Sequence, residues 1–596
     1  MPQARVQHFP DQDPPLFSFR ERERRRSFRT PLFERADGDG AVRELTWGER
    51  VEIVERGDER SRVRTAAGDE GFAETRFLVE TLHAGNRGME RGLPLLKAPQ
   101  GDEKHCDLLW GDPVQVLERG EGRWKVRARG RNGFVGPDDL MEEGLLELYF
   151  IDVGQGDGVL VRTPDGRHLL IDGGYRRVSQ SHGKSAADFV DWKFFHDYGL
   201  LHVELDAMIA SHCDADHHGG LWDMISASPR DRQELDTEAT EVRAFFHAGV
   251  SWWKREDGER YLGPEKGGHL VQLLGGFAGA RAAVQDGADP RLQGQWGQLI
   301  ERVVELVEPE GFRRLGVERG GARQFMPGYE DGDFTIEVLA PVTGTVDGAP
   351  SLPDLGSASQ NTNGHSLLLG LRYGRAHLLL TGDLNKRSMH HLLEAYSGRE
   401  EIFACDVAKG CHHGSDDVSL RFLEAMHAAA TIISSGDNEG HAHPRPAIVA
   451  ASALTGRREV DEEEDELITP LVYATEIERS VRLGRLERIQ ATSYPHGEES
   501  LEVQVYAVDP DRLQADFRND ARLKRAVKTR LFYGETTPGA FRATRADRSV
   551  RGAYVVSGIV YGLVNVRTDG RRILCATRNE GKDAWTIRTF EARSGA

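Results

Sequence analysis

Residues 211–220, with the sequence SHCDADHHGG, constrain the fold of this chain more than any other segment. They directly follow an apolar run at residues 207–210, which is typical of a buried strand. Four potential metal ligands lie in this short segment: His212, Asp214, Asp216 and His217. A strand sends alternate side chains to one side, so the first three can converge at its end while His217 opens a helix. Imidazole and carboxylate groups this close together are typical ligands of zinc, manganese or iron. A metal site is therefore favoured over a solvent-exposed polar turn without a ligand.

The same segment resembles the H-x-H-x-D-H signature of the metallo-β-lactamase superfamily, with Asp214 where that signature usually has its second histidine. The form H-x-D-x-D-H-x-G-G is similar to that of the hydrolase domain of ComEC-type DNA-uptake proteins and their soluble relatives. A carboxylate in place of an imidazole makes one half-site harder, which favours manganese or magnesium over zinc.

Other predicted strand ends carry motifs similar to those of the same subgroup. Residues 152–157 read DVGQGD, residues 381–383 read TGD, residues 409–415 read KGCHHGS and residues 440–444 read GHAHP. The resemblance covers about residues 145–510. It implies the α/β class: an αββα metallo-β-lactamase sandwich, here with small all-β N-terminal SH3-like modules and a small C-terminal β-rich domain.

The resemblance also implies a dinuclear centre of two divalent metal ions, zinc or manganese. The implied metal ligands are His212, Asp214, Asp216, His217, His365, Asp383 and His412, with Asp383 bridging both ions. The ligand role of His365 stays open against simple strand capping. The implied catalytic groups are Asp216, Lys409, His413 and His443, and the implied substrate contacts are Ser415 and His441. Asp157 and Asp172 are expected to orient ligands rather than to bind metal.

An internal repeat precedes the hydrolase region. The sequence LTWG at residues 45–48 recurs as LLWG at residues 108–111, and each copy carries Gly-Phe about 25 residues after its tryptophan. Short alternating strands with glycine turns indicate small β-barrels that resemble bacterial SH3-like domains. We expect these parts: a poorly ordered lead-in (1–40), SH3-like modules (41–83 and 84–144), a hydrolase (145–510) with an insertion at about 225–355, and a basic C-terminal domain (511–596).

Composition limits the partners and the compartment. The chain of 596 residues has a net charge of −19, which argues against coating nucleic acid with the whole surface. From residue 511 onward, however, about 18 Lys and Arg face about 9 Asp and Glu, so this tail is a candidate for docking a phosphate-rich partner or simply a solvated surface. Five scattered cysteines predict reduced thiols, and the lack of a long apolar run predicts a cytoplasmic protein without membrane contact.

These features together predict a metal-dependent hydrolase, in which a metal-activated hydroxide attacks the substrate. By resemblance the substrate class is phosphodiester, so the enzyme is a phosphodiesterase or nuclease with a nucleotide or nucleic-acid substrate. One alternative is an ester, lactone or thioester hydrolase on the same scaffold. A second alternative is a binding or regulatory protein with a vestigial metal site, whose SH3-like modules contact a protein partner.

Overall fold

Strands dominate this protein. The structure is a computed structural model that describes residues 3–9, 19–89, 91–180, 183–436, 443–463, 466–476, 482–493, 499–507, 554–557, 563–579 and 584–593. Strands account for 37% of residues and helices for 23%. The expected α/β class, with an αββα metallo-β-lactamase sandwich, is therefore wrong for this chain, because the largest sheet has 13 strands that all pair antiparallel.

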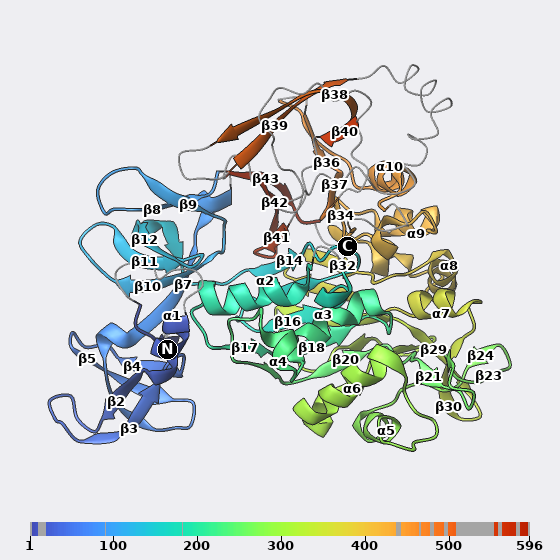
Figure 1. The fold of residues 1–596 in the computed structure, drawn as a ribbon, viewed down its shortest axis with the longest axis horizontal. Helices are drawn as coiled ribbons and strands as arrows, with labels where there is room; N and C mark the ends of the chain where they lie inside the picture. The colour runs from blue at the N-terminus through green and yellow to red at the C-terminus, as the bar shows by residue number, and fades with distance from the viewer. Residues whose placement is uncertain are drawn as a thin grey trace.

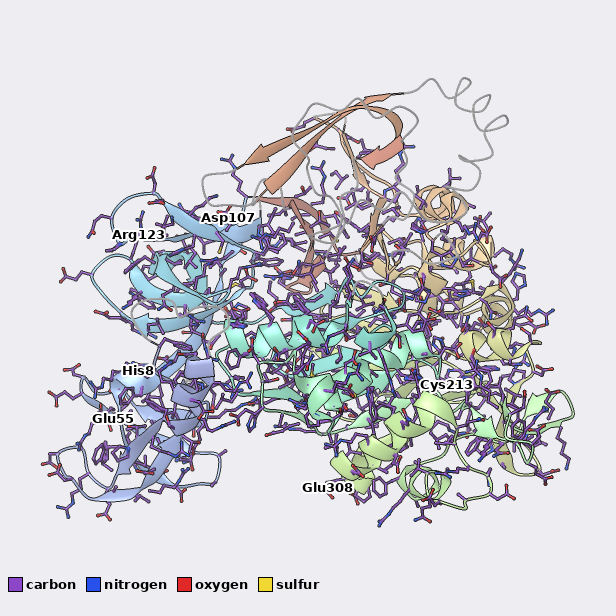
Figure 2. The ribbon with its side chains drawn as sticks, in the orientation of Figure 1. His8, Glu55, Asp107, Arg123, Cys213 and Glu308 are labelled. Atoms are coloured by element: carbon purple, nitrogen blue, oxygen red, sulfur yellow. The ribbon has the colours of Figure 1, made fainter. Side chains whose placement is uncertain are left out.

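The 13-stranded sheet forms the N-terminal part of the molecule, drawn in blue in Figure 1. Its strands are β1 (Gln3–Val6), β2 (Arg29–Phe33), β3 (Ala41–Thr46), β4 (Arg50–Glu55), β5 (Arg60–Thr65), β6 (Glu70–Glu74), β7 (Leu78–Ala84), β8 (Leu93–Leu96), β9 (Lys104–Leu108), β10 (Pro113–Glu118), β11 (Trp124–Ala128), β12 (Arg131–Val135) and β13 (Leu140–Met141). The two sequence repeats keep separate apolar cores, one around Val51 and Val63 and the other around Leu95 and Val126. Glu55 and Arg123 mark these two halves in Figure 2.

The lead-in expected at residues 1–40 joins the two repeats into one sheet. Strand β1 pairs with β4 on one side and with β7 on the other, so it completes the backbone hydrogen bonds of both halves. Helix α1 (Phe19–Ser27) and strand β2 follow it. The described part of the lead-in is thus ordered, because its backbone groups pair with strands distant in sequence.

A nine-stranded sheet lies at the centre of the molecule (Figure 1). In spatial order its strands are β25 (Phe312–Arg314), β20 (Phe245–His247), β18 (Ala207–Ala210), β16 (His168–Ile171), β15 (Val159–Arg162), β14 (Leu146–Phe150), β41 (Val564–Thr568), β42 (Arg572–Asn579) and β43 (Ala584–Glu591). Strand β41 pairs antiparallel with β14, so the described end of the chain completes this sheet instead of standing apart as a C-terminal domain. Most of residues 511–562 lie outside the described residues.

A seven-stranded sheet packs on one face of the nine-stranded sheet. In spatial order its strands are β27 (Gln324–Phe325), β28 (Phe334–Ala340), β31 (Leu368–Tyr373), β32 (Ala376–Leu380), β33 (Val407–Lys409), β34 (Ala430–Ile433) and β37 (Leu471–Ala474). Apolar side chains of both sheets, such as Leu148 and Ile209 from one and Leu369 and Leu378 from the other, form a single core. The two sheets therefore pack face to face.

Helices cover the outer faces of these two sheets. Helices α2 (Ala186–Trp192), α3 (Ala215–Ile225) and α6 (Gly294–Leu306) pack on the nine-stranded sheet through side chains such as Leu221 and Ile300. Helices α8 (Lys386–Ala395), α9 (Leu420–Met426) and α10 (Pro446–Thr455) pack on the seven-stranded sheet. No helix among the described residues is long and apolar enough to cross a membrane.

The segment at about residues 225–355 is not a separate insertion, because β20 and β25 belong to the nine-stranded sheet and β28 to the seven-stranded sheet. Its other elements are short and lie beside the central sheet (Figure 1). They include helices α4 (Pro229–Arg232) and α5 (Phe277–Ala283) and strands β19 (Ala239–Val242), β21 (Trp253–Lys254), β22 (Arg260–Tyr261), β23 (Glu265–Lys266), β24 (His269–Leu270), β26 (Val317–Glu318), β29 (Val342–Val346) and β30 (Ala349–Pro353). The remaining described strands and α-helix are β17 (His202–Leu205), α7 (Ala358–Gly364), β35 (Glu459–Asp461), β36 (Glu466–Thr469), β38 (Arg482–Ser493), β39 (Glu499–Ala507) and β40 (Tyr554–Ser557).

Buried and half-buried ion pairs join the N-terminal sheet to the central body. Arg5 of β1 contacts Glu204 of β17 at 2.8 Å, and Trp47 donates to the carbonyl oxygen of Gly199 at 2.6 Å. Arg567 of β41 contacts Asp112 at 2.6 Å, with both side chains almost completely buried. These contacts join segments far apart in the sequence into one structure.

Candidate metal centre

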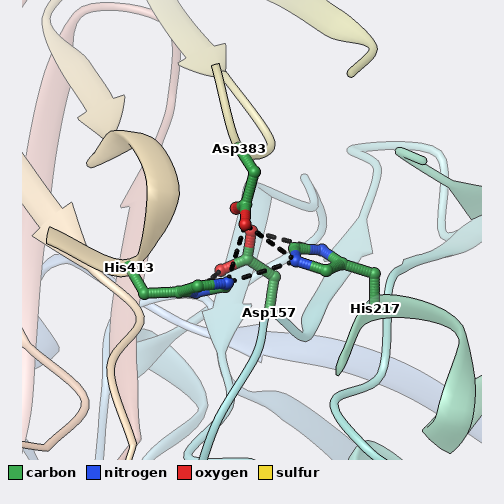
Figure 3. A group of neighbouring side chains, drawn as sticks. All are labelled: Asp157, His217, Asp383 and His413. Carbon is green, nitrogen blue, oxygen red and sulfur yellow. Dashed lines mark hydrogen bonds and ion pairs between the residues drawn. The ribbon is translucent and has the colours of Figure 1, made fainter. Parts of the chain in front are cut away.

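Four buried side chains converge where the edges of the two central sheets meet (Figure 3). They are Asp157, His217, Asp383 and His413, and each offers one ligand atom within 4.8 Å of the others. Each comes from a different segment: the loop after β14, the first turn of α3, the residues after β32 and the turn after β33. Two carboxylates and two imidazoles are a donor set that divalent transition metals accept.

The strand order explains why these segments meet. Strands β16, β18 and β20 run parallel, so their C-terminal ends share one edge, and β32 and β33 are parallel neighbours in the other sheet. The backbone N–H of Leu367 donates to the carbonyl oxygen of Ser211 at 2.9 Å, which links the start of β31 to the end of β18. The two ligand-bearing edges are thereby held against each other.

Glycine lets the loop of residues 152–158 approach the start of α3. A Cβ atom on Gly156 would lie 1.8 Å from the carbonyl oxygen of Asp216, and the φ angle of Gly156 is 115°. Only glycine tolerates both this contact and this backbone conformation. The DVGQGD motif therefore acts through its backbone as well as through Asp157.

The distances within the cluster are short enough for shared ligation. The Oδ2 atom of Asp383 lies 3.2 Å from Nε2 of His217 and 2.9 Å from Nε2 of His413. The two Nε2 atoms are 3.2 Å apart, and Nδ1 of His413 lies 3.3 Å from Oδ1 of Asp157. Both imidazoles therefore present a nitrogen toward the same small volume beside the Asp383 carboxylate.

The electrostatics of the cluster favour a cation at this point. Burial opposes a charge on His413, yet Asp383 and Asp157 outweigh it and raise the pKa of His413 to about 10. The pKa of His217 is also raised well above its ordinary value, because Asp383 and Asp172 outweigh burial. Two carboxylates that attract protons onto adjacent imidazoles provide the negative potential that a divalent ion would neutralise instead.

Asp172 fixes the orientation of His217. Its Oδ2 atom accepts a hydrogen bond from Nδ1 of His217 at 2.9 Å, and its Oδ1 atom accepts one from the backbone of Ser211 at 2.8 Å. Nε2 of His217 is therefore the nitrogen that faces the cluster. Asp172 has a φ angle of 57°, a strained conformation for a residue with a side chain, which its two acceptor roles help to maintain.

His212 and Asp214 lie beside the cluster. The rings of His212 and His217 are 4.0 Å apart, and Nε2 of His212 is 3.8 Å from Oδ2 of Asp214. Among the described residues, Nε2 of His212 is buried without a hydrogen-bond partner. Burial, followed by the charge of His217, lowers the pKa of His212 to about 3, so the ring is neutral and one of its two nitrogens has a free electron pair.

Asp214 and Asp216 have additional partners. Asp214 accepts hydrogen bonds from Nε1 of Trp252 at 3.2 Å and from Oγ1 of Thr362 at 2.7 Å. Asp216 lies with Oδ2 at 3.6 Å from Nε2 of His413, and it accepts a weak bond from Gln155 at 3.4 Å. Both predicted carboxylates, Asp214 and Asp216, thus lie next to the four-residue cluster but are not part of it.

The histidine pair of the KGCHHGS motif is placed differently from the prediction. His413, expected as a catalytic donor, lies in the buried cluster, whereas His412, expected as a ligand, lies at its rim with 25% of its side chain exposed. Nε2 of His412 is 3.9 Å from Oδ2 of Asp383 and accepts a hydrogen bond from Asn363 at 3.1 Å. Both histidines have positive φ angles, 47° and 52°, so the tight turn decides which ring points inward.

His365 does not reach the cluster. Its Nε2 atom donates to the carbonyl oxygen of Pro353 at 2.8 Å, toward β30. The neighbouring Thr362 and Asn363, which the sequence reasoning did not single out, face Asp214 and His412 instead. The run of polar residues 361–363 just before a buried strand could have indicated further site residues. Which of them point toward the site, however, depends on the geometry of helix α7.

Lys409 is too buried to offer a charge to a substrate. Its side chain is 2% exposed, forms an ion pair with Asp157, lies 3.5 Å from Oδ1 of Asp383 and donates to the carbonyl oxygen of Gly382 at 2.8 Å. Burial opposes its charge, but Asp157 and Asp383 raise its pKa above the ordinary value. Lys409 therefore neutralises the carboxylates of Asp157 and Asp383 within the core. This differs from the expected catalytic role, in which its charge would contact the substrate.

The remaining predicted residues lie near the rim or outside the description. Ser415 is buried and accepts a hydrogen bond from the backbone of Asp417 at 3.2 Å. His443 is buried, with its ring 6.0 Å from the ring of His412. His441 lies outside the described residues.

Comparison with known proteins gives no family. No protein-family profile matches the chain, and no curated protein sequence matches it. Among solved structures, NlpC2 and NlpC1 from Trichomonas vaginalis are similar at 14% and 12% identity, over 24% and 23% of this chain and 47% and 45% of theirs, with a TM-score of 0.11 for each. A protein of unknown function from Enterococcus faecalis V583 is similar at 12% identity, over 47% of this chain and 56% of that chain, with a TM-score of 0.19.

This chain therefore spans about half the length of those structures, and similarities at such TM-scores carry no argument about fold or function. The fold and the site define a β-rich protein with a buried Asp/His group compatible with metal binding.

Proposed function

We propose that this protein is a metal-dependent hydrolase that cleaves phosphodiesters in nucleotides or single-stranded nucleic acid. The observation that supports it most is the convergence of Asp157, His217, Asp383 and His413 from four segments. Burying two carboxylates and two imidazoles together is costly unless they bind one another or a cation, and such clusters concentrate at functional sites. The phosphodiester class rests on the resemblance of the motifs to ComEC-type hydrolases.

The donor set fits a divalent ion. The four cluster residues would hold it, and the buried, unpartnered Nε2 of His212 with the neighbouring Asp214 offers ligands for a second ion. A divalent ion bound here lowers the pKa of a water ligand and polarises a phosphoryl oxygen.

The protein's own groups supply orientation and proton transfer. Asp172 holds His217 with Nε2 toward the site, and Lys409 compensates the charge of Asp157 and Asp383. Burial lowers the pKa of His412, so this partly exposed imidazole at the rim is neutral and placed to accept a proton from an attacking water. In this proposal, the buried residues bind and the rim residue transfers the proton.

Metal analysis combined with hydrolysis assays tests the proposal. The purified protein should carry divalent metal and cleave bis-p-nitrophenyl phosphate, more strongly in manganese than in zinc because Asp214 hardens the site. Asp383→Ala should lose both the metal and the turnover. His365→Gln is the matched control, because His365 is a buried histidine directed away from the cluster, and it should keep both. Turnover of a lactone panel without phosphodiester cleavage would contradict the substrate class, and full activity without metal would contradict the mechanism.

A further inference from the structure

The hairpin formed by β21 and β22 lies against the candidate metal centre. Trp252, the residue before β21, donates from Nε1 to Oδ1 of Asp214 at 3.2 Å. The guanidinium carbon of Arg260, at the start of β22, lies 4.2 Å from the centroid of the Trp252 ring. Cys213, labelled in Figure 2, precedes Asp214, and Arg260 is among the charges that act on its thiol. Arg260 is therefore separated from Asp214 by a single indole ring.

The register of the hairpin places these groups on one face. Lys254 pairs directly with Arg260, and Trp253 pairs with Tyr261. Since side chains alternate along a strand, Trp252, Lys254 and Arg260 share one face, while Trp253 points to the other and is buried in the core. The face beside Asp214 thus combines an aromatic ring with two cations.

Arg260 is exposed and has no acidic partner in the described part of the chain. The connecting turn carries Glu256, Asp257 and Glu259, and none of them lies within ion-pair distance of Arg260 or Lys254. Many other arginines of this acidic protein pair with carboxylates, for example Arg5 with Glu204 and Arg162 with Glu147. An arginine stacked on an indole is held in place while its N–H groups stay available, and a guanidinium matches the geometry of a phosphate.

We infer that Arg260 binds a phosphate adjacent to the one cleaved, so that this site selects substrates with at least two backbone phosphates. This inference rests on the proposed function and deepens it. Trp252 is a positioning residue, which holds the guanidinium by stacking and orients Asp214 by its hydrogen bond. A short single-stranded oligonucleotide fits this arrangement, whereas a compact diester with one phosphate leaves Arg260 without a contact.

Steady-state kinetics with two substrates test the selection. Arg260→Ala should raise KM for a ten-residue oligothymidylate about tenfold, while kcat and the kinetics on bis-p-nitrophenyl phosphate stay unchanged. Arg260→Lys should recover part of the loss, because it keeps the charge but not the planar stacking. Arg255→Ala is the control, since Arg255 is a cation of the same hairpin that lies over Tyr261. Equal effects of Arg260→Ala on both substrates, or no effect on either, would overturn the inference.

A binding measurement separates this inference from the proposed function. Fluorescence anisotropy of labelled oligothymidylate, in EDTA and without turnover, should show weaker binding by Arg260→Ala and a salt dependence reduced by about one ion contact. If binding depends on Arg260 but no phosphodiester is turned over, the proposed hydrolase function is wrong and phosphate binding by Arg260 is supported. If the protein turns over phosphodiesters and Arg260→Ala binds the oligonucleotide as well as wild type does, the hydrolase function is supported and phosphate binding by Arg260 is wrong.

Discussion

Nε2 of His217 and Nε2 of His413 face each other at 3.2 Å, although the two residues are 196 positions apart in the chain. Asp172 directs the ring of His217 from its other side, whereas Nδ1 of His413 lies 3.2 Å from the carbonyl oxygen of Ser434 and 3.3 Å from Oδ1 of Asp157. Two buried imidazole nitrogens in such proximity repel when both are protonated, and the carboxylate of Asp383 beside them relieves this only in part. A divalent ion would satisfy all three groups at once.

The adjacent histidines of the KGCHHGS motif should have separable roles. His413→Ala should abolish metal retention because it removes a buried ligand, whereas His412→Ala should keep the metal and lower kcat on the order of 10²-fold because a proton acceptor is lost. Metal analysis after gel filtration and kcat on bis-p-nitrophenyl phosphate measure the two effects. Loss of metal from the His412 variant with retention by the His413 variant would reverse the assignment.

Asp172→Asn should weaken metal binding without removing a ligand. The amide has one acceptor oxygen and no charge, whereas Asp172 accepts from both Ser211 and His217, so the imidazole loses its fixed orientation or part of its basicity. Substitutions of this kind cost about 10- to 100-fold in metal affinity. Competition with a chromogenic chelator gives the affinity, and an unchanged value would show that Asp172 only supports the turn after β16.

Lys409→Met should destabilise the metal-free protein more than the metal-loaded protein. Without the ammonium group, only the imidazoles of His217 and His413 balance the buried carboxylates, and breaking such a buried pair costs about 3–5 kcal/mol. A bound divalent ion supplies the missing positive charge, so thermal unfolding with added manganese should recover most of the lost stability. If the variant unfolds like the wild type without metal and instead loses affinity for substrate, Lys409 contacts the substrate after all.

The attachment of β1 should weaken in acid. Burial raises the pKa of Glu204, but its hydrogen bonds and ion pairs with Arg5 and Arg50 outweigh this and lower the pKa to about 2 from an ordinary value of 4.5. A lowered pKa means that the pair stabilises the folded protein above about pH 4.5 and that this contribution is lost as the pH falls toward 2. The thermal midpoint of wild type should therefore exceed that of Glu204→Gln near pH 6, and the two should converge near pH 2. A constant difference across this range would show that Glu204 contributes by packing alone.

The sequence by itself determined where the chemistry-bearing residues gather along the chain. The segments at residues 152–157, 211–220, 381–383 and 409–415 each follow an apolar run, and the structure places all four at strand ends around one cluster. Strand periodicity and the polarity of the following residues are local properties, so the amino-acid sequence alone predicts these segments.

Tertiary packing decided which member of each polar run enters the site. His413 and not His412 points inward, and Asn363 and not His365 faces the centre, because a turn with positive φ and the last turn of α7 set those directions. Asp157 is brought into the cluster by the close approach of Gly156 to α3, a contact between residues about 60 apart in the sequence.

The extent of the sheets was also decided by tertiary structure. The short strand β1 has little pattern of its own, and it exists because β4 and β7 offer it backbone partners on both sides. Likewise, the end of the chain joins the central sheet because β41 pairs with β14 and Arg567 finds Asp112. Local sequence determines which residues favour a strand, but hydrogen bonding between distant segments determines which sheet they complete.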